Sequence, residues 1–307
     1  MKKMLRLCRL PLGALVVSLG LLGVGVASAQ AAVIFNGAPG SGAPPATLGP
    51  YTMTPFPTDT RTQGSTVSSI PAPNAKQVLL SPSSELRAVG AGWATGAWAG
   101  GTYSGALYFA NGATTQTLTL PPDTGAVYFY AEPDQFGSPT LTATAQNGTT
   151  SGPISVPVNA TEPNGQYYGF YGTNGDVISS ITVTTPVTDG FALGDFAIAY
   201  VTPTSLRVAP QFSLSGGGVG EGFVSATLTA GGNPVSGQTI TFSVHTPYLG
   251  VVTLCKATTN TRGVATCAVN SAQEFFVLSV NAYSASYTSS GVYLGSSGTT
   301  AAVELGP

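Results

Sequence analysis

The stretch VSATLTAGGNPVSGQTITFSV, residues 224–244, indicates the fold class of this 307-residue chain. Apolar residues occupy every second position of 224–229 and again of 239–244, with serine and threonine between them. This alternation directs one set of side chains toward a core and the other toward water, as in a half-buried β-strand. The Gly-Gly-Asn-Pro segment at 231–234 is a turn signal between the two runs.

The same pattern recurs along the chain, separated by Asn-Gly turns at Asn147, Asn164 and Asn174. Many short alternating runs with polar turns predict antiparallel β-sandwiches, and we therefore expect an all-β protein. We find no convincing amphipathic helix after the first thirty residues. Further alternating runs are QTLTL (116–120), VYFYA (127–131), TLTATA (140–145) and ISSITVT (178–184).

The N-terminus has the three parts of a secretory signal peptide. Basic residues lie between Lys2 and Arg9, an apolar run covers 10–26, and Ala27-Ser28-Ala29 supplies small residues for cleavage after Ala29. Cleavage after Ala31 is a close alternative. The apolar run is short for a membrane anchor and is interrupted by glycine. We expect an exported bacterial protein, secreted or at the cell surface, without membrane insertion.

Composition excludes one class of partner. Cleavage would remove four of the ten basic residues and none of the twelve acidic ones, which leaves six against twelve and a net charge of −6. Nucleic-acid binding rests on clustered Lys and Arg, so this balance argues against it. The 13 Tyr and 13 Phe argue against disorder in a chain rich in Gly and Pro.

A proline-punctuated segment at 201–210 predicts a join between two domains. We expect a first β-sandwich over residues 30–202 and a second over 203–307. The roughly 100 residues after the join match the size of an immunoglobulin-like sandwich.

Cys255 and Cys267 are the cysteines that remain after export. We predict that they form a disulfide, because exported proteins fold in an oxidising compartment. Residues 260–263 form a turn signal, and a hairpin about Thr261 would place the two cysteines directly opposite each other on paired strands. A zinc site is disfavoured, because His245 is the single histidine. A redox-active pair would be closely spaced at a helix start, so we expect a structural disulfide.

The second domain resembles bacterial Ig-like domains of the invasin and intimin type. The resemblance rests on Asn233-Pro234, Gly237-Gln238, Phe242, the paired Thr258-Thr259, and Gly263 with Ala265. It spans roughly residues 204–305 and implies an immunoglobulin-like sandwich that serves as a spacer, stalk or adhesion module.

The first domain resembles secreted bacterial domains that accompany exosortase (PEP-CTERM type) sorting signals. Three motifs near its end show the likeness: GFYG at 169–172, ISSITV at 178–183 and GFALGDFAIA at 190–199. The resemblance implies a jelly-roll or lectin-like sandwich. The chain departs from the commonest members because it ends without a sorting tail, which puts covalent anchoring in doubt.

Aromatic residues are the main candidates for ligand binding. Trp93, Trp98, Tyr128 and Tyr130 could stack on sugar rings while their polar atoms bond hydroxyls. Tyr128 and Tyr130 alternate with Val127 and Phe129, so we expect one of these pairs to face outward. The ordinary alternative is burial, because sandwiches bury tryptophan.

Carboxylates are sparse but form one close pair, Glu132 and Asp134, in a loop that follows an aromatic strand. We name them as candidate calcium ligands, since calcium prefers oxygens from flexible loops. Solvated turn acids are the alternative reading. We expect no catalytic residue: His245 has no nucleophile motif beside it.

The sequence therefore predicts a non-enzymatic, adhesin-like surface or matrix protein. Its partner would be an extracellular polysaccharide or another cell-surface component, with no cofactor unless calcium binds. A subunit that self-assembles through sheet edges is one alternative. A carbohydrate-active enzyme that uses Glu132 with Asp134 or Asp123 is another.

Overall fold

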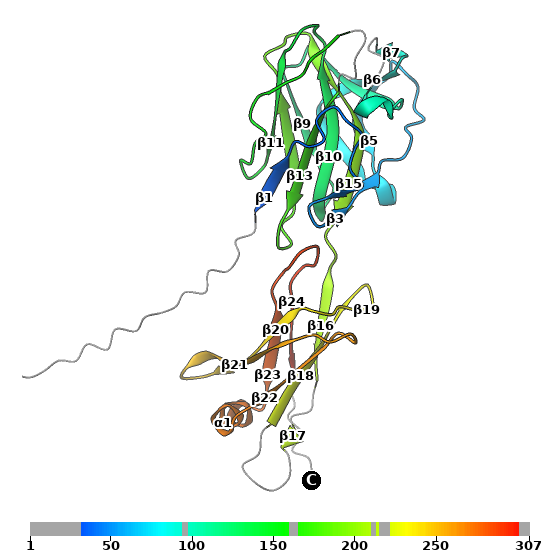
Figure 1. Ribbon diagram of the computed structural model, residues 1–307. Coiled ribbons are helices and arrows are strands. Elements are labelled where there is room, and N and C mark those ends of the chain that lie inside the picture. Colours follow the sequence, from blue (N-terminus) through cyan, green and yellow to red (C-terminus); the bar gives the residue numbers. More distant parts are fainter. Residues whose placement is uncertain (1–31, 94–97, 160–164, 210–212, 215–221, 301–307) are drawn as a thin grey trace, which may run out of the picture. The chain divides into compact units, whose positions relative to one another are not determined.

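The computed structural model describes residues 32–93, 98–159, 165–209, 213–214 and 222–300. The predicted signal peptide at 1–29 lies outside the described residues. No helix among those described is long and apolar enough to cross a membrane. The expected fold class is confirmed, because the strands of the described chain form β-sheets whose ladders are antiparallel, apart from the short parallel pairing of β6 with β7 (Figure 1).

One sheet holds most strands between residues 33 and 200, and it curls into two facing halves. Figure 1 shows β1 beside β13 at one edge. The first half follows the order β1 (Val33–Asn36), β13 (Gln166–Gly172), β10 (Thr124–Pro133), β15 (Gly190–Tyr200) and β8 (Ala106–Asn111). The second half follows the order β9 (Thr115–Thr119), β14 (Ser180–Thr184), β11 (Thr140–Ala145) and β12 (Ile154–Ser155).

Strand β6 (Gln77–Val89) joins the two halves. Residues 79–81 pair with β9, whereas residues 85–87 pair with β8. Pro82 lies between these stretches. Proline has no backbone N–H to donate to a ladder, and it is tolerated here because the strand is changing from one partner to the other. Short strands complete this part of the chain: β2 (Thr47–Leu48), β3 (Tyr51–Thr52), β4 (Thr54–Pro55), β5 (Thr66–Pro71) and β7 (Gly92–Trp93).

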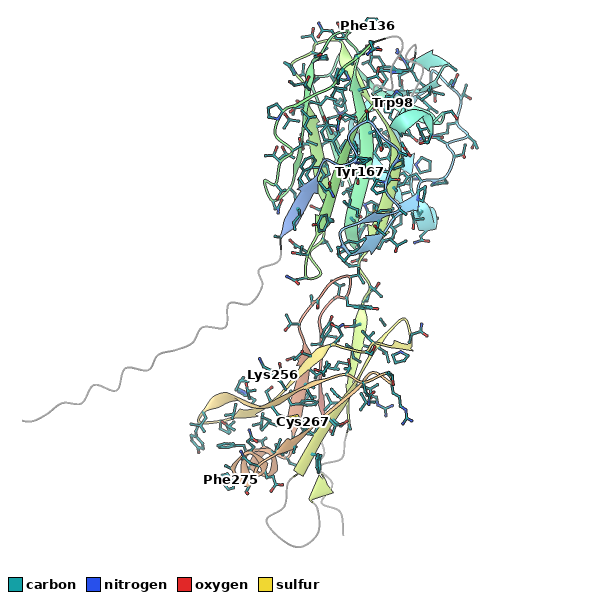
Figure 2. The ribbon with its side chains drawn as sticks, viewed as in Figure 1. Trp98, Phe136, Tyr167, Lys256, Cys267 and Phe275 are labelled. Carbon is teal, nitrogen blue, oxygen red and sulfur yellow. A yellow bond between two sulfur atoms is a disulfide. The ribbon has the colours of Figure 1, made fainter. Side chains whose placement is uncertain are left out.

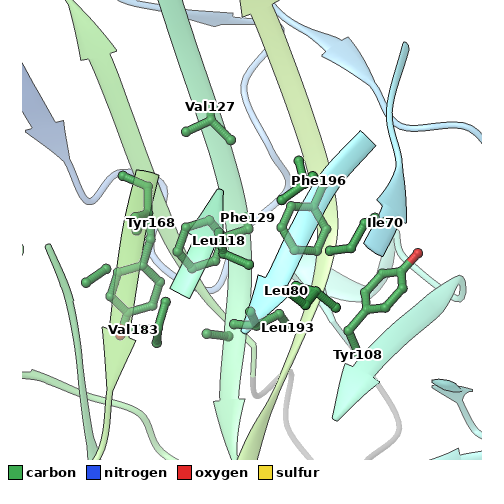
Figure 3. Packing of buried hydrophobic residues seen from close by; sticks show 14 of the residues in the cluster. Ile70, Leu80, Tyr108, Leu118, Val127, Phe129, Tyr168, Val183, Leu193 and Phe196 are labelled. Carbon is green, nitrogen blue, oxygen red and sulfur yellow. The ribbon is translucent and has the colours of Figure 1, made fainter. Parts of the chain in front are cut away.

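The inner faces of the two halves enclose one hydrophobic core. Phe129 of β10 stacks on Tyr168 of β13, with ring centroids 5.6 Å apart. Leu118 and Val183, from the opposite half, belong to the same cluster (Figure 3). The alternating runs QTLTL and ISSITVT point their apolar residues into this core, as expected.

The outer face of β13, β10, β15 and β8 carries a second apolar cluster. Segments near 42–53 and 98–107 cover it, so all ten residues of β10 are buried. Tyr130 donates a hydrogen bond from its hydroxyl to the Gly42 carbonyl oxygen. Trp98 lies against Gly165, where a Cβ atom would come within 2.8 Å of the indole ring.

The chain from 204 to 300 forms two further sheets around its own core. In one sheet, β18 (Gly222–Ala230) pairs with β16 (Thr204–Val208), β17 (Ser213–Leu214), β19 (Asn233–Pro234) and β22 (Val264–Val269). The other has the order β21 (Gly250–Thr258), β20 (Thr239–Thr246), β23 (Tyr283–Tyr287) and β24 (Ser296–Thr300). The opening stretch 224–244 thus supplies one central strand to each sheet.

The sequence reading missed one helix, α1 (Ser271–Val280). The Asn270 side-chain oxygen accepts a hydrogen bond from the Gln273 backbone N–H, and the Gln273 side chain accepts one from the Asn270 N–H, both at 3.0 Å. This reciprocal pair is a capping box. The Asn-x-x-Gln spacing was therefore a readable signal for the helix start.

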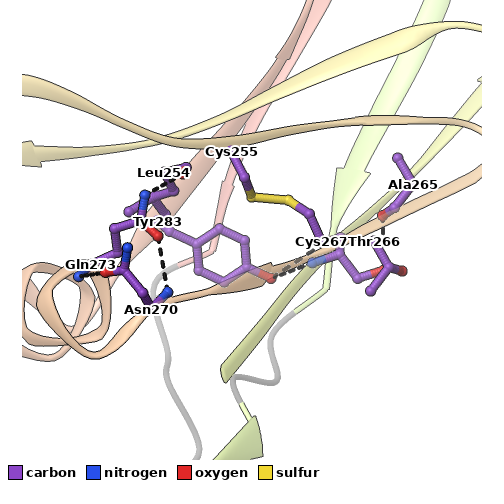
Figure 4. The surroundings of a disulfide bond; sticks show 9 residues. Leu254, Cys255, Ala265, Thr266, Cys267, Asn270, Gln273 and Tyr283 are labelled. Atoms are coloured by element: carbon purple, nitrogen blue, oxygen red, sulfur yellow. Dashed lines mark hydrogen bonds between the residues drawn. A yellow bond between two sulfur atoms is a disulfide. The ribbon is translucent and has the colours of Figure 1, made fainter. Parts of the chain in front are cut away.

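Cys255 and Cys267 form the predicted disulfide, but the predicted hairpin is wrong (Figure 4). Cys255 lies opposite Phe242 on β20, and Cys267 lies opposite Val224 on β18. The bond therefore links the two sheets across the core, with 6.5 Å between the Cα atoms. After the turn at 260–263 the chain crosses to the other sheet, so that β21 pairs with β20 whereas β22 pairs with β18.

Candidate functional site

The four aromatic residues predicted to bind sugars are all buried. Trp98 and Tyr130 have no exposed surface, and Trp93 and Tyr128 keep only a few per cent. The expectation of an outward-facing aromatic pair on β10 is wrong, because the outer cluster covers that face of the strand. A buried ring face cannot stack on a sugar. Figure 2 shows Trp98 and Tyr167 within the sandwich, whereas Phe136 lies at its end.

Three of the predicted site residues do come together. Trp93, Glu132 and Asp134 line a pocket of about 270 Å³ at the end of β10. Its wall also includes Arg87 of β6, and Gln135 and Phe136 of the loop after β10. We call this cavity the Phe136 pocket. Trp98, Tyr128 and Tyr130 contribute to the outer core instead.

The loop that carries Phe136 is fixed at both sides. The Asp134 N–H donates to the Gly190 carbonyl oxygen at 2.9 Å. Gly137 and Val158 exchange two backbone hydrogen bonds of 3.0 and 2.8 Å. Between these anchors the Phe136 side chain is 68% exposed. An apolar ring held this way on a short loop offers a preformed stacking surface.

Arg87 gives the pocket a fixed cation. Its guanidinium lies 3.9 Å from the Phe109 ring centroid and pairs with Glu85, Nη2 to Oε2, at 3.1 Å. The indole of Trp93 packs against the same phenylalanine, with ring centroids 5.3 Å apart. Guanidinium N–H groups suit hydroxyl and carboxylate oxygens in planar geometry.

The acids of the pocket differ in burial. Glu132 is fully buried and pairs with Ala192 across β10 and β15, whereas Asp134 is exposed. Although Asp134 is exposed, partial desolvation by the surrounding protein raises its pKa; Arg87 opposes this shift, and the nearby Asp189 charge adds to it. The pocket therefore combines a cation with two carboxylates, one buried and one exposed.

No group of three or more His, Cys, Asp or Glu side chains within the described ranges is placed to hold a metal ion. A calcium ion at Glu132 and Asp134 would need carbonyl or water oxygens to complete its shell. Calcium binding stays a prediction.

The pairing of Glu132 with Asp123 for glycoside hydrolysis is wrong. Asp123 precedes β10 and Glu132 lies near its other end, so an extended strand separates them by about 30 Å. Retaining glycosidases need two carboxylates about 5 Å apart, and inverting ones less than about 10 Å. His245 is exposed on β20, opposite Val251.

Sequence reasoning missed Arg87, Gln135 and Phe136. A signal existed for Phe136, because a lone aromatic residue in the polar turn DQFGSP has no strand pattern to bury it. Arg87 gave no comparable signal. Its place in the pocket follows from the pairing of β6 with β8, which brings residues far apart in sequence together.

No family model matches the chain, and no curated protein matches it. Among solved structures, the adhesin domain of Epf from Streptococcus pyogenes is similar at 12% identity and a TM-score of 0.28, over 66% of this chain and 77% of that one. A DUF4785 family protein from Legionella pneumophila is similar at 8% identity and a TM-score of 0.25, over 82% and 71%.

A biofilm associated protein B domain is similar at 7% identity and a TM-score of 0.16, over 63% of this chain and 84% of that one. By name, the first is an adhesin domain, the second is a member of the DUF4785 family, and the third is a domain of a biofilm associated protein. Scores this low do not establish a shared fold.

Proposed function

We propose that this chain is an exported, non-enzymatic, adhesin-like surface protein whose first sandwich binds carbohydrate at the Phe136 pocket. The second sandwich acts as a spacer that its disulfide stiffens. The signal-peptide features of residues 1–29 and the disulfide support an oxidising, extracytoplasmic location.

The observation that carries the proposal is the exposed Phe136 ring on its anchored loop, beside Arg87, Asp134 and Gln135. An aromatic face stacks on the apolar C–H face of a sugar ring. Guanidinium, carboxylate and amide groups then bond the hydroxyls at its rim. The pocket replaces the buried aromatics as the glycan site and keeps Trp93, Glu132 and Asp134 within it.

The test uses the mature chain, residues 30–307, in pull-downs against insoluble and cell-surface polysaccharides, with calcium and with EDTA. We expect retention on at least one polysaccharide and its loss in Phe136→Ala. Phe275→Ala is the matched control, because Phe275 is also 68% exposed but lies on α1 of the second sandwich (Figure 2).

Equal loss of retention in both variants would indicate nonspecific apolar adsorption and contradict the glycan site. Retention that requires calcium would support the metal prediction at Glu132 and Asp134. Hydrolysis of the bound polysaccharide would contradict the non-enzymatic assignment.

Self-assembly through a sheet edge is a second candidate function. Strand β21 lies at the edge of its sheet, and Val251 on it is exposed. The turn before it adds Tyr248 and Leu249, and the Tyr248 side chain is 97% exposed. An exposed apolar edge favours pairing with another strand. Filaments by electron microscopy that disappear in Val251→Lys would support this function.

A further inference from the structure

Asp195 lies at an irregularity in the middle of β15. Tyr128 of β10 pairs with Ala197 and Tyr130 pairs with Gly194, so Asp195 and Phe196 together face a single residue, Phe129. This is a β-bulge, and Asp195 has a φ of 45°, in the left-handed region. Such strained residues persist where the surrounding structure holds them, and they concentrate at binding sites.

The bulge opens into a second pocket, of about 210 Å³, which we call the Asp195 pocket. Phe56, Tyr103 and Tyr108 contribute aromatic rings to its wall, and Asp59 and Asp195 contribute carboxylates. The volume is below the about 300–1,000 Å³ of sites for drug-sized ligands. It therefore suits one functional group with a short aliphatic body.

One of the two carboxylates is already neutralised. Asp59 accepts a hydrogen bond from Arg61 Nε at 2.9 Å and another from the Tyr108 hydroxyl at 2.9 Å. The hydrogen bond from Arg61 is the main reason that the pKa of Asp59 is lowered. The pair of Asp59 and Arg61 thus presents little net charge to a ligand.

The other carboxylate, that of Asp195, is mostly buried and forms neither a hydrogen bond nor an ion pair within the described residues. Tyr103, its neighbour in the pocket wall, donates its hydroxyl proton to the Ala106 carbonyl oxygen at 2.7 Å instead. A partly buried anion without a partner costs free energy unless a cation reaches it.

We propose that the Asp195 pocket binds a primary ammonium group on a short aliphatic chain or ring, with Asp195 as its counter-ion. The aromatic rings of Phe56, Tyr103 and Tyr108 would stabilise the same cation through their π faces. This site is separate from the Phe136 pocket and shares no lining residue with it.

Binding should weaken in acid. Burial raises the pKa of Asp195 to about 6, and protonation removes its charge. The other groups facing Asp195 keep their state from pH 5 to 8: Tyr103, Tyr128 and Tyr130 stay neutral because burial raises the pKa of each, and Asp59 stays paired with Arg61.

The test is calorimetric titration of the mature chain with n-butylamine at pH 7.5, with n-butanol as the uncharged probe. We expect saturable binding of the amine alone, and an affinity that falls at least about tenfold in Asp195→Asn, because charge-assisted hydrogen bonds are roughly twice as strong as neutral ones. Asparagine tolerates the left-handed region, so the bulge should persist.

Asp123→Asn is the matched control, since Asp123 also has a positive φ, 65°, but lies in the exposed turn before β10. It should leave the affinity unchanged. A wild-type titration at pH 5, where butylamine stays protonated, needs no variant and should show the same loss as Asp195→Asn.

Titrations with Nα-acetyllysine amide and with glucosamine distinguish a lysyl side chain from an amino sugar as the source of the ammonium group. Saturable binding of either supports the proposal. Equal binding of butylamine and butanol would overturn it, and so would an affinity that is unchanged in Asp195→Asn or at pH 5.

Discussion

Strand β10 of the first sandwich and strand β20 of the second both lie in the middle of a sheet, yet they are buried differently. All ten residues of β10 are buried, because a core lies on each of its faces. In β20 the apolar positions are buried and the alternate Ser and Thr positions stay partly exposed. Apolar residues on both faces of a strand therefore indicate that the strand is covered on both sides and that neither face is a binding surface.

The two sandwiches also gain their stability differently. The first has two hydrophobic clusters on one continuous sheet, whereas the second has one cluster and a disulfide between its two sheets. The substitutions below test these differences, from the largest expected effect to the smallest.

Truncation on either face of β10 should be severe. Phe129→Ala opens the inner core and Tyr128→Ala the outer one, and each should lower the free energy of unfolding by about 3–5 kcal/mol. On β20, Phe242→Ala should lower the free energy of unfolding by a similar amount. Ser243→Ala should change it by no more than about 0.5 kcal/mol. Urea denaturation measures all four, and a small effect of Tyr128→Ala would contradict a true core on the outer face.

Loss of the disulfide should destabilise the second sandwich. For a loop of this length the chain-entropy model gives about 3 kcal/mol. We expect the double variant Cys255→Ala, Cys267→Ala to unfold at lower denaturant, as dithiothreitol-treated wild type should. The shift that Phe129→Ala causes in the unfolding transition should be the same with and without the disulfide. Strongly coupled effects would show that the two cores unfold as one unit.

Asp195 should make the first sandwich less stable at neutral pH than in mild acid. Its folded pKa of about 6 lies above the unfolded value of 3.8, so the folded state binds the proton more tightly. The resulting destabilisation is small near pH 4, grows as the pH rises from about 4 to 6, and is fully present above pH 6. Asp195→Asn should therefore be more stable than wild type at pH 7 by on the order of 2 kcal/mol. This figure is smaller than the full pKa shift would give, because the carboxyl keeps some solvent contact. Denaturation of both proteins at pH 4 and pH 7 measures the difference, which should shrink at pH 4.

The turn between β21 and β22 should contribute least. The Asn260 side-chain oxygen accepts hydrogen bonds from the N–H groups of Arg262 and Val264 at 2.9 and 3.1 Å. Asn260→Ala should cost about 1 kcal/mol. Thr261→Ala is a suitable control, and thermal unfolding checks both. Loss of the disulfide in Asn260→Ala would mean that the turn, rather than the sheets, positions the cysteines.

Local pattern was enough to predict the strands and the disulfide partners. Alternation in 224–229 and 239–244 reports which residues turn inward, and export leaves Cys255 and Cys267 to pair with each other. The Asn270 capping box shows that α1 was also readable. The register of the cysteines was not, because a turn signal does not say whether the next strand joins the same sheet or the opposite one.

By itself, the sequence determined an all-β antiparallel chain with one disulfide, because side-chain periodicity and the number of cysteines can be read without knowing which strands pair. Only the tertiary structure decided that Tyr128 and Tyr130 are buried, that Phe136 is exposed beside Arg87, and that Asp195 lies unpaired in a pocket. Each of these depends on a segment distant in sequence that covers, or leaves open, one face of a strand. That covering follows from strand order, which no single run of residues encodes.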